Sequence, residues 1–207
     1  RATPDDVRIG EVVLEDRAVH EALAESGVTI EVVDEDSGRP TPARITVLND
    51  AGALQTFSAG SNDGLAVRPG LAYTVSGRAE LRLPAGEYSV YAGRGFEYSL
   101  ASAKVRLMVG ETEHLVLSIR REVPTDGWVA SDTHIHTVTH SGHGDATLSE
   151  RIVTLAAEGV ELPIATDHGV YVDYEQMARK LGARQFFTPV VGSEVTTPAG
   201  HFNIFPV

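Results

Sequence analysis

The chain has 207 residues, of which 42% are hydrophobic and 22% charged, a composition typical of a globular protein with room for two small domains. Its formal net charge of −12 argues against nucleic acid or an anionic membrane surface as the main partner. The absence of cysteine excludes disulfides and thiolate metal sites, so any metal must bind through nitrogen and oxygen ligands. No apolar run reaches the roughly 18–20 residues of a membrane-spanning helix, and no signal peptide is present.

The first part of the chain has the pattern of an antiparallel β-sandwich. Residues 11–25 fit either a strand or a short amphipathic helix. From about residue 27, apolar Val28, Ile30 and Val32 alternate with polar neighbours, which is the pattern of a half-buried strand. We expect further strands at 43–48, 71–75, 79–83, 87–91, 101–109 and 111–119. Many short strands separated by Gly- and Pro-containing turns predict a sandwich.

A charged stretch that contains Pro124 and Gly127 suggests a domain boundary, with residues 1–124 before it and 125–207 after it. Strands and helices then alternate. We expect strands at 128–133, 162–166, 187–195 and 202–207, and helices at 147–158 and 173–182. The first of these helices begins with the capping-box spacing of Thr147 and Glu150. The β-α-β-α-β order predicts a mainly parallel sheet or barrel.

Metal-ligand residue types are concentrated in the last third of the chain, where six of the eight histidines lie. His134 and His136 are two residues apart on an expected strand, so their side chains point to one face. His168 and Glu194 come at the carboxyl ends of the next two strands, which is where parallel α/β sheets form their sites. The pattern predicts a site for several metal ions at this edge. His20 and His114 lie outside it and are expected to be structural or exposed.

Four short motifs carry a family resemblance. They are Asp132-Thr-His134-Ile-His136, Thr166-Asp167-His168, Gly192-Ser-Glu194 and Gly200-His201-Phe202. In this order and spacing, residues 127–207 resemble the PHP (polymerase and histidinol phosphatase) metallohydrolases, most of all their carbaryl-hydrolase-like branch. Residues 29–50 and the Leu83-Pro-Ala-Gly-Glu-Tyr stretch are similar to carboxypeptidase-regulatory-like sandwich modules. The resemblance implies an α+β multidomain protein, in which the sandwich precedes the first part of a distorted β/α barrel.

The resemblance implies two or three divalent ions, which would be Zn, Mn or Fe. It places His134, His136 and Glu194 around the first ion, and Glu194 as a bridge to a second ion that His201 also binds. The family's later ligands have no counterpart before residue 207. Together with the start at Arg1 and the abrupt last strand, this leads us to expect a fragment of a longer protein whose site is incomplete in this chain.

A third ion would be bound by His168 and by a residue of the loop after the first strand, where His143 and Asp145 are both candidates and His140 is a poorer one. Asp167 would act as a ligand or orient an imidazole from behind. Glu194 and Asp167 are the residues to which the resemblance assigns catalytic roles. His143 and Asp145 are not distinguished by the sequence.

The resemblance implies a hydrolase in which a metal-bound hydroxide attacks a small phosphoester, or an ester, amide or carbamate. The alternative is a non-catalytic module, in which the sandwich binds a glycan or a protein and the metal site is incomplete or structural. Four tyrosines of the sandwich are candidates for a glycan-binding strip, although packing is their more common role: Tyr73, Tyr88, Tyr91 and Tyr98. The sandwich resemblance and the missing initial Met favour a secreted or periplasmic location.

Overall fold

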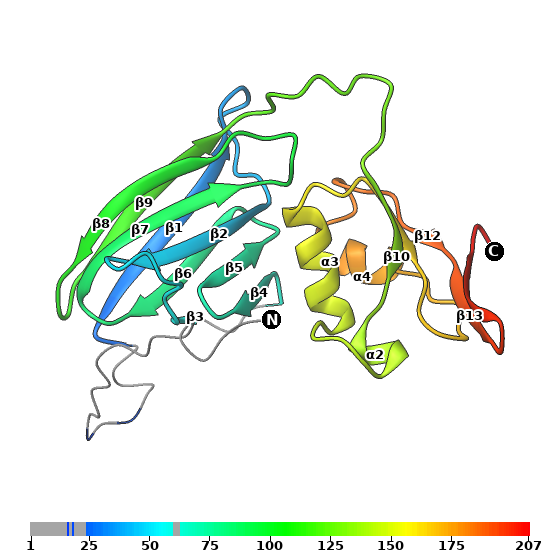
Figure 1. The fold of residues 1–207 in the computed structure, drawn as a ribbon. Coiled ribbons are helices and arrows are strands. Elements are labelled where there is room, and N and C mark those ends of the chain that lie inside the picture. The colour runs from blue at the N-terminus through cyan, green and yellow to red at the C-terminus, as the bar shows by residue number, and fades with distance from the viewer. Residues whose placement is uncertain (1–15, 17, 19–23, 60–62) are drawn as a thin grey trace, which may run out of the picture.

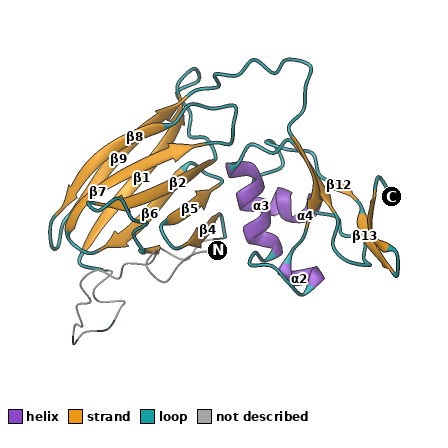
Figure 2. Ribbon diagram, viewed as in Figure 1, coloured by secondary structure: helices purple, strands orange, loops and turns teal. Residues whose placement is uncertain are grey.

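The computed structural model describes residues 16, 18, 24–59 and 63–207 (Figure 1). These residues form a β-sandwich followed by a smaller unit of helices and short strands, as Figure 2 shows. Most of the ambiguous segment 11–25, including His20, lies outside the described residues. The β-sandwich predicted from the strand and turn pattern is confirmed.

The sandwich consists of a four-stranded and a five-stranded sheet. The four-stranded sheet has the order β3-β6-β1-β9, with β3 (Ser58–Ala59), β6 (Arg78–Leu83), β1 (Ser26–Asp34) and β9 (Thr112–Ile119). The five-stranded sheet has the order β4-β5-β2-β7-β8, with β4 (Leu65–Arg68), β5 (Leu71–Thr74), β2 (Ala43–Asn49), β7 (Gly86–Gly93) and β8 (Ala101–Leu107). Neighbouring strands are antiparallel except β1 and β9, which pair in parallel.

The core of the sandwich is built by the alternation that the sequence predicts. Val28, Ile30 and Val32 of β1 are fully buried and belong to one hydrophobic cluster with Ile45 and Val90 of the other sheet. Thr29 and Glu31 occupy the positions between them on β1 and are half-buried on the other face of the sheet. Burial of each such apolar side chain stabilises the fold by about 1.5–3 kcal/mol, so the sandwich has a core of its own.

The second unit contains β10 (Ser131–Ile135), β11 (Leu162–Ala165) and β12 (Val190–Val191), which form a parallel sheet in this order. Its helices are α2 (Val138–Ser141), α3 (Leu148–Ala157) and α4 (Glu175–Lys180). An antiparallel hairpin of β13 (Ser193–Thr197) and β14 (Gly200–Ile204) follows. The expected alternation of strands and helices is therefore present. Among the described helices, none is both long and apolar enough to cross a bilayer.

The expected strand 187–195 is divided at Gly192 into β12 and β13. A Cβ atom at this position would lie 2.8 Å from the carbonyl oxygen of Ile204 and 3.0 Å from that of Ala165. The backbones of β11 and β14 therefore come too close for any other residue without a shift. The division turns the chain out of the parallel sheet and into the hairpin that carries Glu194 and His201.

Helix α3 lies between the sandwich and the small sheet, as Figure 1 shows. Its buried face includes Ile152, Val153 and Leu155, which share a hydrophobic cluster with Ala66 and Val75 of the sandwich. The sandwich and the second unit, which the loop between β9 and β10 links in the chain, therefore pack against each other through α3. The exact domain boundary near residue 124 stays a prediction.

The fold gives no evidence of the expected PHP-type barrel. Within the described residues, β10, β11 and β12 form an open three-stranded sheet, and β13 and β14 pair with each other. A single parallel bridge between His168 and Glu194 connects the hairpin to the end of β11. The described residues therefore show a β-sandwich with a small open α/β unit, and the barrel itself has no support from the fold.

Candidate metal centre

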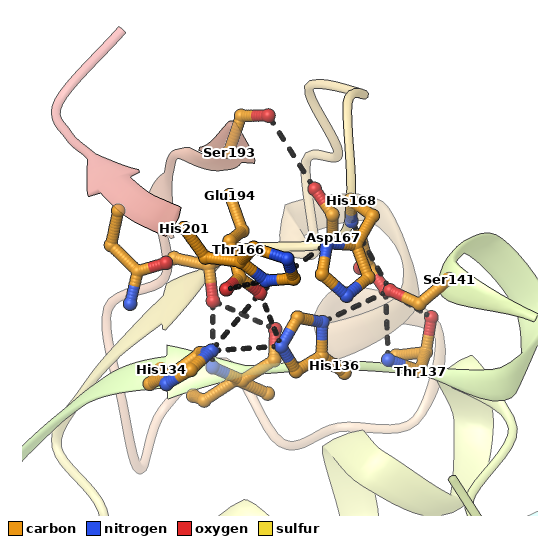
Figure 3. Close-up of polar contacts among 12 residues, drawn as sticks. His134, His136, Thr137, Ser141, Thr166, Asp167, His168, Ser193, Glu194 and His201 are labelled. Atoms are coloured by element: carbon orange, nitrogen blue, oxygen red, sulfur yellow. Dashed lines mark hydrogen bonds and ion pairs between the residues drawn. The ribbon is translucent and has the colours of Figure 1, made fainter. Parts of the chain in front are cut away.

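Five histidines and one glutamate meet where β10 and β11 end and the hairpin begins. Figure 3 shows Glu194 with His134, His136, His168 and His201 around it. The residues of the cluster come from β10, the segments after β10 and β11, the loop between α2 and α3, and the hairpin. Their possible ligand atoms form three overlapping groups, in each of which the atoms lie within 4.8 Å of one another. The groups are His134, His136 and Glu194; His168, Glu194 and His201; and His136, His143 and His168.

The strand geometry that the sequence predicts is present in β10. Ile135 is buried beneath the sheet, and His134 and His136 project together on the opposite side. Their Nε2 atoms lie 2.9 Å apart. Two imidazoles approach this closely only when a proton or a cation lies between the nitrogens.

Glu194 is the centre of the cluster, although its side chain is almost fully buried. Its Oε2 lies 3.1 Å from Nε2 of His134, 2.9 Å from Nε2 of His136 and 3.4 Å from Nδ1 of His168. Its Oε1 lies 2.8 Å from Nδ1 of His201. Burial acts to raise the pKa of Glu194, but the hydrogen bonds with His134 and His201 outweigh it and hold the pKa below its usual value. The carboxylate is therefore ionised at neutral pH.

Asp167 is fully buried behind the cluster, and its oxygens are occupied by other groups. Oδ1 accepts hydrogen bonds from the Thr137 amide at 2.8 Å, the Thr137 hydroxyl at 3.0 Å and the Ser141 hydroxyl at 2.7 Å. Oδ2 accepts one from the Tyr174 hydroxyl at 3.1 Å. Burial, followed by the charge of Asp167, raises the pKa of Tyr174, so its hydroxyl stays protonated as a donor. Asp167 therefore supports the cluster from behind instead of facing it.

Ser141 connects Asp167 to His136 and determines which nitrogen of that ring carries hydrogen. The only proton of the Ser141 hydroxyl is donated to Asp167, so Oγ can only accept at 3.0 Å from Nδ1 of His136. It also accepts from the backbone N–H of His168 at 3.2 Å. The proton of neutral His136 is thus on Nδ1, and Nε2 presents a lone pair to the cluster.

This tautomer brings two acceptors face to face. Nε2 of His136 lies 2.9 Å from Oε2 of the ionised Glu194. Burial lowers the pKa of His136, which favours the neutral ring despite the opposing effect of Glu194. A lone pair and a carboxylate oxygen repel each other at this distance unless a cation lies between them. The geometry therefore fits a bound metal ion.

His168 carries a second indication of the same kind. Its Nδ1 atom is buried and has no hydrogen-bond partner, although Oε2 of Glu194 lies 3.4 Å away. Its ring stacks on that of His136 with centroids 4.7 Å apart. An unpaired buried nitrogen is unfavourable, whereas coordination to a metal would satisfy it.

The structure separates the two candidates for the loop ligand. The His143 ring lies 5.1 Å from that of His136 and 5.0 Å from that of His168, between centroids. Asp145 is not brought to the cluster, because its Oδ2 binds Nε of Arg68 at 2.9 Å. The hydrogen bond from Arg68 lowers the pKa of Asp145. His140 is exposed on α2 and belongs to none of the three groups.

Several supporting residues were not found from the sequence. Ser141, Thr137 and Tyr174 surround Asp167, and Arg68 binds the loop from the sandwich. Ser141 lies between His140 and His143 in the sequence, and this position beside candidate ligands could have marked it as a supporting residue. Arg68 and Tyr174 gave no local signal, because they reach the site only through tertiary packing. His114 is exposed on β9, outside the cluster, as expected.

No protein-family model matches the chain, and no curated protein does. Among solved structures, a minor pilin of Streptococcus agalactiae is similar over 48% of this chain and 45% of its own, with 17% identity and a TM-score of 0.36. The group B streptococcus pilus 2b backbone protein matches 48% of this chain and 42% of its own, with 18% identity and a TM-score of 0.35. A Klebsiella pneumoniae 5-hydroxyisourate hydrolase matches 47% of this chain and 92% of its own, with 16% identity and a TM-score of 0.32.

The family assignments made from the short motifs are therefore corrected. The similar structures are mainly pilin sandwiches, with no PHP-family protein among them. The prediction of a PHP metallohydrolase, with its phosphoesterase activity, is wrong by these comparisons, as is the related assignment of the sandwich. The physical reason is that motifs of three to five residues record ligand types and strand ends, which occur on unrelated folds.

Proposed function

We propose that the chain is a non-catalytic metal-binding module, in which a β-sandwich supports a site for two or three divalent ions. Zn, Mn or Fe are the candidate ions, since all three bind nitrogen and oxygen ligands. Five imidazoles and one carboxylate form a nitrogen-rich donor set, which favours Zn or Fe over Mn. In this role the cluster would bind the metal ions, and the bound ions would order the second unit without catalysing a reaction.

The observation that carries the proposal is the contact between Nε2 of His136 and Oε2 of Glu194 at 2.9 Å. Asp167 and Ser141 hold the proton of His136 on the far nitrogen, so no hydrogen is available for this contact. The unpaired Nδ1 of His168 supports the same conclusion from an independent side chain. A cation between these atoms would relieve both unfavourable arrangements.

The three overlapping groups suggest how the ions would be divided. One ion would lie among His134, His136 and Glu194, and another among Glu194, His168 and His201. A third would use His143 together with rings that the first two already contact. Because Glu194 belongs to two groups, its removal is expected to affect at least two ions.

Metal content per chain tests the proposal directly. The wild type, the His134→Ala/Glu194→Ala variant and a His114→Ala/Glu113→Ala control should be measured by elemental analysis after gel filtration. The control removes an exposed histidine and an exposed glutamate of β9. We expect two or more equivalents in the wild type and the control, and fewer than one in the cluster variant. Wild-type protein without metal, after incubation with Zn²⁺, would contradict the proposal.

The non-catalytic part of the proposal needs its own measurement. The metal-loaded wild type and the His134→Ala/Glu194→Ala variant should be compared for turnover of p-nitrophenyl phosphate and p-nitrophenyl acetate. We expect no difference between them. Turnover that is present in the wild type and lost in the variant would show that the cluster is catalytic.

A groove on the sandwich favours a second candidate function, the binding of a glycan. A cavity of about 480 Å³ lies over β2, β7 and β8, and Tyr91 lines it together with Glu87, Lys104 and Arg106. Within the described part of the chain, these three charged side chains make no ion pair. An aromatic ring flanked by free hydrogen-bonding groups is suited to a sugar.

The four tyrosines do not form the continuous strip that the sequence left open as the less common alternative to packing, since Tyr73 and Tyr98 lie elsewhere. Tyr73 lines a cavity beside α3, and the hydroxyl of Tyr98 accepts a hydrogen bond from Arg94. Titration calorimetry with cellohexaose, xylohexaose and chitohexaose would test the groove, with Tyr91→Ala and the exposed Tyr171→Ala as a matched pair. Binding that Tyr91→Ala alone abolishes would support this candidate, and no binding of any of the three would count against it.

A further inference from the structure

Arg68 reaches from the sandwich to the loop that carries His143. It is the last residue of β4. Its Nε donates to Oδ2 of Asp145 at 2.9 Å, its Nη1 donates to Oε1 of Glu150 at 3.0 Å, and its Nη2 donates to the main-chain oxygen of Asp145. Nη1 also donates to the carbonyl of Val67 at 2.7 Å, which fixes the guanidinium against its own strand.

The contact with the main-chain oxygen distinguishes this arrangement from an ordinary surface ion pair. A pair between two side chains restrains only the side chains and contributes little when it is exposed. Arg68 also binds the backbone of Asp145, so it restrains the path of the loop itself. Its side chain is about a quarter exposed, which reduces screening by solvent.

The loop needs such a restraint. His143 lies between Gly142, with φ 72°, and Gly144, with φ 93°. Glycine is the most conformationally permissive residue, so the chain on both sides of His143 is intrinsically flexible. Within the described residues, His143 itself makes no hydrogen bond. The base of the loop is closed by a 2.8 Å hydrogen bond from the Val138 amide to the Ala146 carbonyl. On one side of His143 the Gly142 amide donates to the Val138 carbonyl at 3.2 Å, and on the other side Arg68 restrains the loop at Asp145.

We propose that Arg68 is a positioning residue, through which the sandwich holds His143 in place as a ligand of the third metal ion. The inference rests on the proposed metal-binding function. A ligand that is already ordered binds its ion without the entropy cost of ordering the loop. Loss of Arg68 should therefore weaken one ion, the one that uses His143, and leave the ions of the other two groups in place.

Zinc titrations against a competing chelator test this on the full chain. The proteins are the wild type, Arg68→Ala, His143→Ala and the control Arg44→Ala. Arg44 also bridges the sandwich and the second unit, through a 2.8 Å pair with Glu158, but it does not contact the loop. We expect Arg68→Ala to weaken one equivalent by about 10- to 100-fold, as the loss of groups that orient ligands generally does. His143→Ala should affect the same equivalent, and Arg44→Ala none.

A second variant covers the case in which Arg68→Ala disturbs folding. Asp145→Ala removes the side-chain part of the tether and leaves the contact of Arg68 with the main-chain oxygen of residue 145, and the Arg68→Ala/Asp145→Ala double variant completes the cycle. If Asp145 acts only through Arg68, Asp145→Ala weakens the third ion no more than Arg68→Ala does, and the double variant binds it as weakly as Arg68→Ala alone. A further loss in the double variant would make Asp145 a direct ligand and overturn the inference.

The outcomes separate the two proposals. Three equivalents in the wild type, with the same affinities in Arg68→Ala and Arg44→Ala, would overturn the role of Arg68 and leave the metal-binding function intact. A wild type that binds only two ions, both unaffected by His143→Ala, would do the same. A wild type that binds no zinc would overturn both proposals together.

Discussion

At the residue scale, the properties of the cluster depend on a hydroxyl group that is not itself a metal ligand. Ser141 has one proton and two lone pairs, and all three are used: it donates to Asp167 and accepts from His136 and from the His168 amide. This full use of the hydroxyl leaves no freedom for the His136 ring to exchange its tautomer. The orientation of the lone pair on Nε2 is thus decided by Asp167, through Ser141.

Ser141→Ala should therefore weaken metal binding although no ligand is removed. We expect a loss of about 10- to 100-fold in zinc affinity, because His136 is no longer held as the Nδ1–H tautomer. Ser193→Ala is the matched control, since the buried Ser193 hydroxyl contacts the Asp167 carbonyl at 3.4 Å and no histidine. Chelator competition gives the affinities, and nitrogen NMR of the His136 ring reports the tautomer. Equal affinities in both variants would refute the role of Ser141.

At the element scale, α3 connects the metal centre to the sandwich. Its start is defined by a capping box, in which the Thr147 hydroxyl accepts from the Glu150 amide at 3.3 Å and the Glu150 carboxylate accepts from the Thr147 amide at 2.9 Å. The same Glu150 carboxylate accepts from Arg68. One residue thus helps to begin the helix and to attach it to β4.

Thr147→Ala should destabilise the protein by about 1 kcal/mol, since a lost N-cap side chain leaves a helix N–H without its partner. Thr112→Ala, an exposed threonine at the start of β9, is a suitable comparison because it caps no helix. Urea denaturation followed by circular dichroism measures both. A change in Thr147→Ala no larger than in Thr112→Ala would mean that the cap contributes nothing to stability.

At the scale of the whole molecule, the sandwich and the second unit meet through close backbone contacts. Gly95 has φ 62°, and a Cβ atom there would lie well inside contact distance of the Glu158 carbonyl oxygen at the end of α3. Arg94 donates to the Ala156 carbonyl at 3.2 Å from the same turn. The turn after β7 therefore needs a glycine both for its conformation and for the approach of α3.

Gly95→Ala should destabilise the protein more than Gly110→Ala. Both glycines have positive φ, 62° and 80°, so alanine is strained at each by about 1–2 kcal/mol. Nothing lies within 4 Å of the would-be Cβ at Gly110, whereas Gly95 meets the backbone of Glu158. The free energy of unfolding is measured for both variants by urea denaturation. The amount by which Gly95→Ala loses more than Gly110→Ala reports how firmly α3 packs on the sandwich. Equal losses would indicate a loose junction.

The contacts of Arg68 give the junction a pH dependence. The Arg68 hydrogen bond lowers the pKa of Asp145, and for Glu150 the bonds from the Thr147 amide and Arg68 outweigh the opposing effect of burial. In the folded state both pKa values lie below the ordinary 3.8 of Asp and 4.5 of Glu. The stabilisation by the contacts of Arg68 with these carboxylates is therefore fully present above the ordinary values. It is lost as the pH falls through the folded-state values.

The difference in unfolding free energy between the wild type and Arg68→Ala should therefore be constant from about pH 8 to about pH 5 and smaller at about pH 3. Urea denaturation in the presence of EDTA, at each pH, keeps metal binding out of the comparison. Arg44→Ala serves as the control for the loss of an arginine from the same junction. A difference that does not change between neutral and acid pH would show that these carboxylates are not coupled to Arg68.

The sequence by itself determined the features that depend on near neighbours. The alternation of Val28, Ile30 and Val32 predicts a buried strand, the Thr147–Glu150 spacing predicts the start of α3, and the His134–His136 spacing predicts two imidazoles on one face. Each of these follows from the period of a strand or from hydrogen bonds within a single turn.

Only the tertiary structure decided how these elements combine. It leaves β10, β11 and β12 as an open sheet where the motifs suggested a barrel, because strand ends carry no information about sheet closure. It brings His143 to the cluster and holds Asp145 away from it, a choice made by Arg68, which is 77 residues distant in the chain. Contacts at such separations arise from the packing of the sandwich against α3, and no local pattern of residues encodes them.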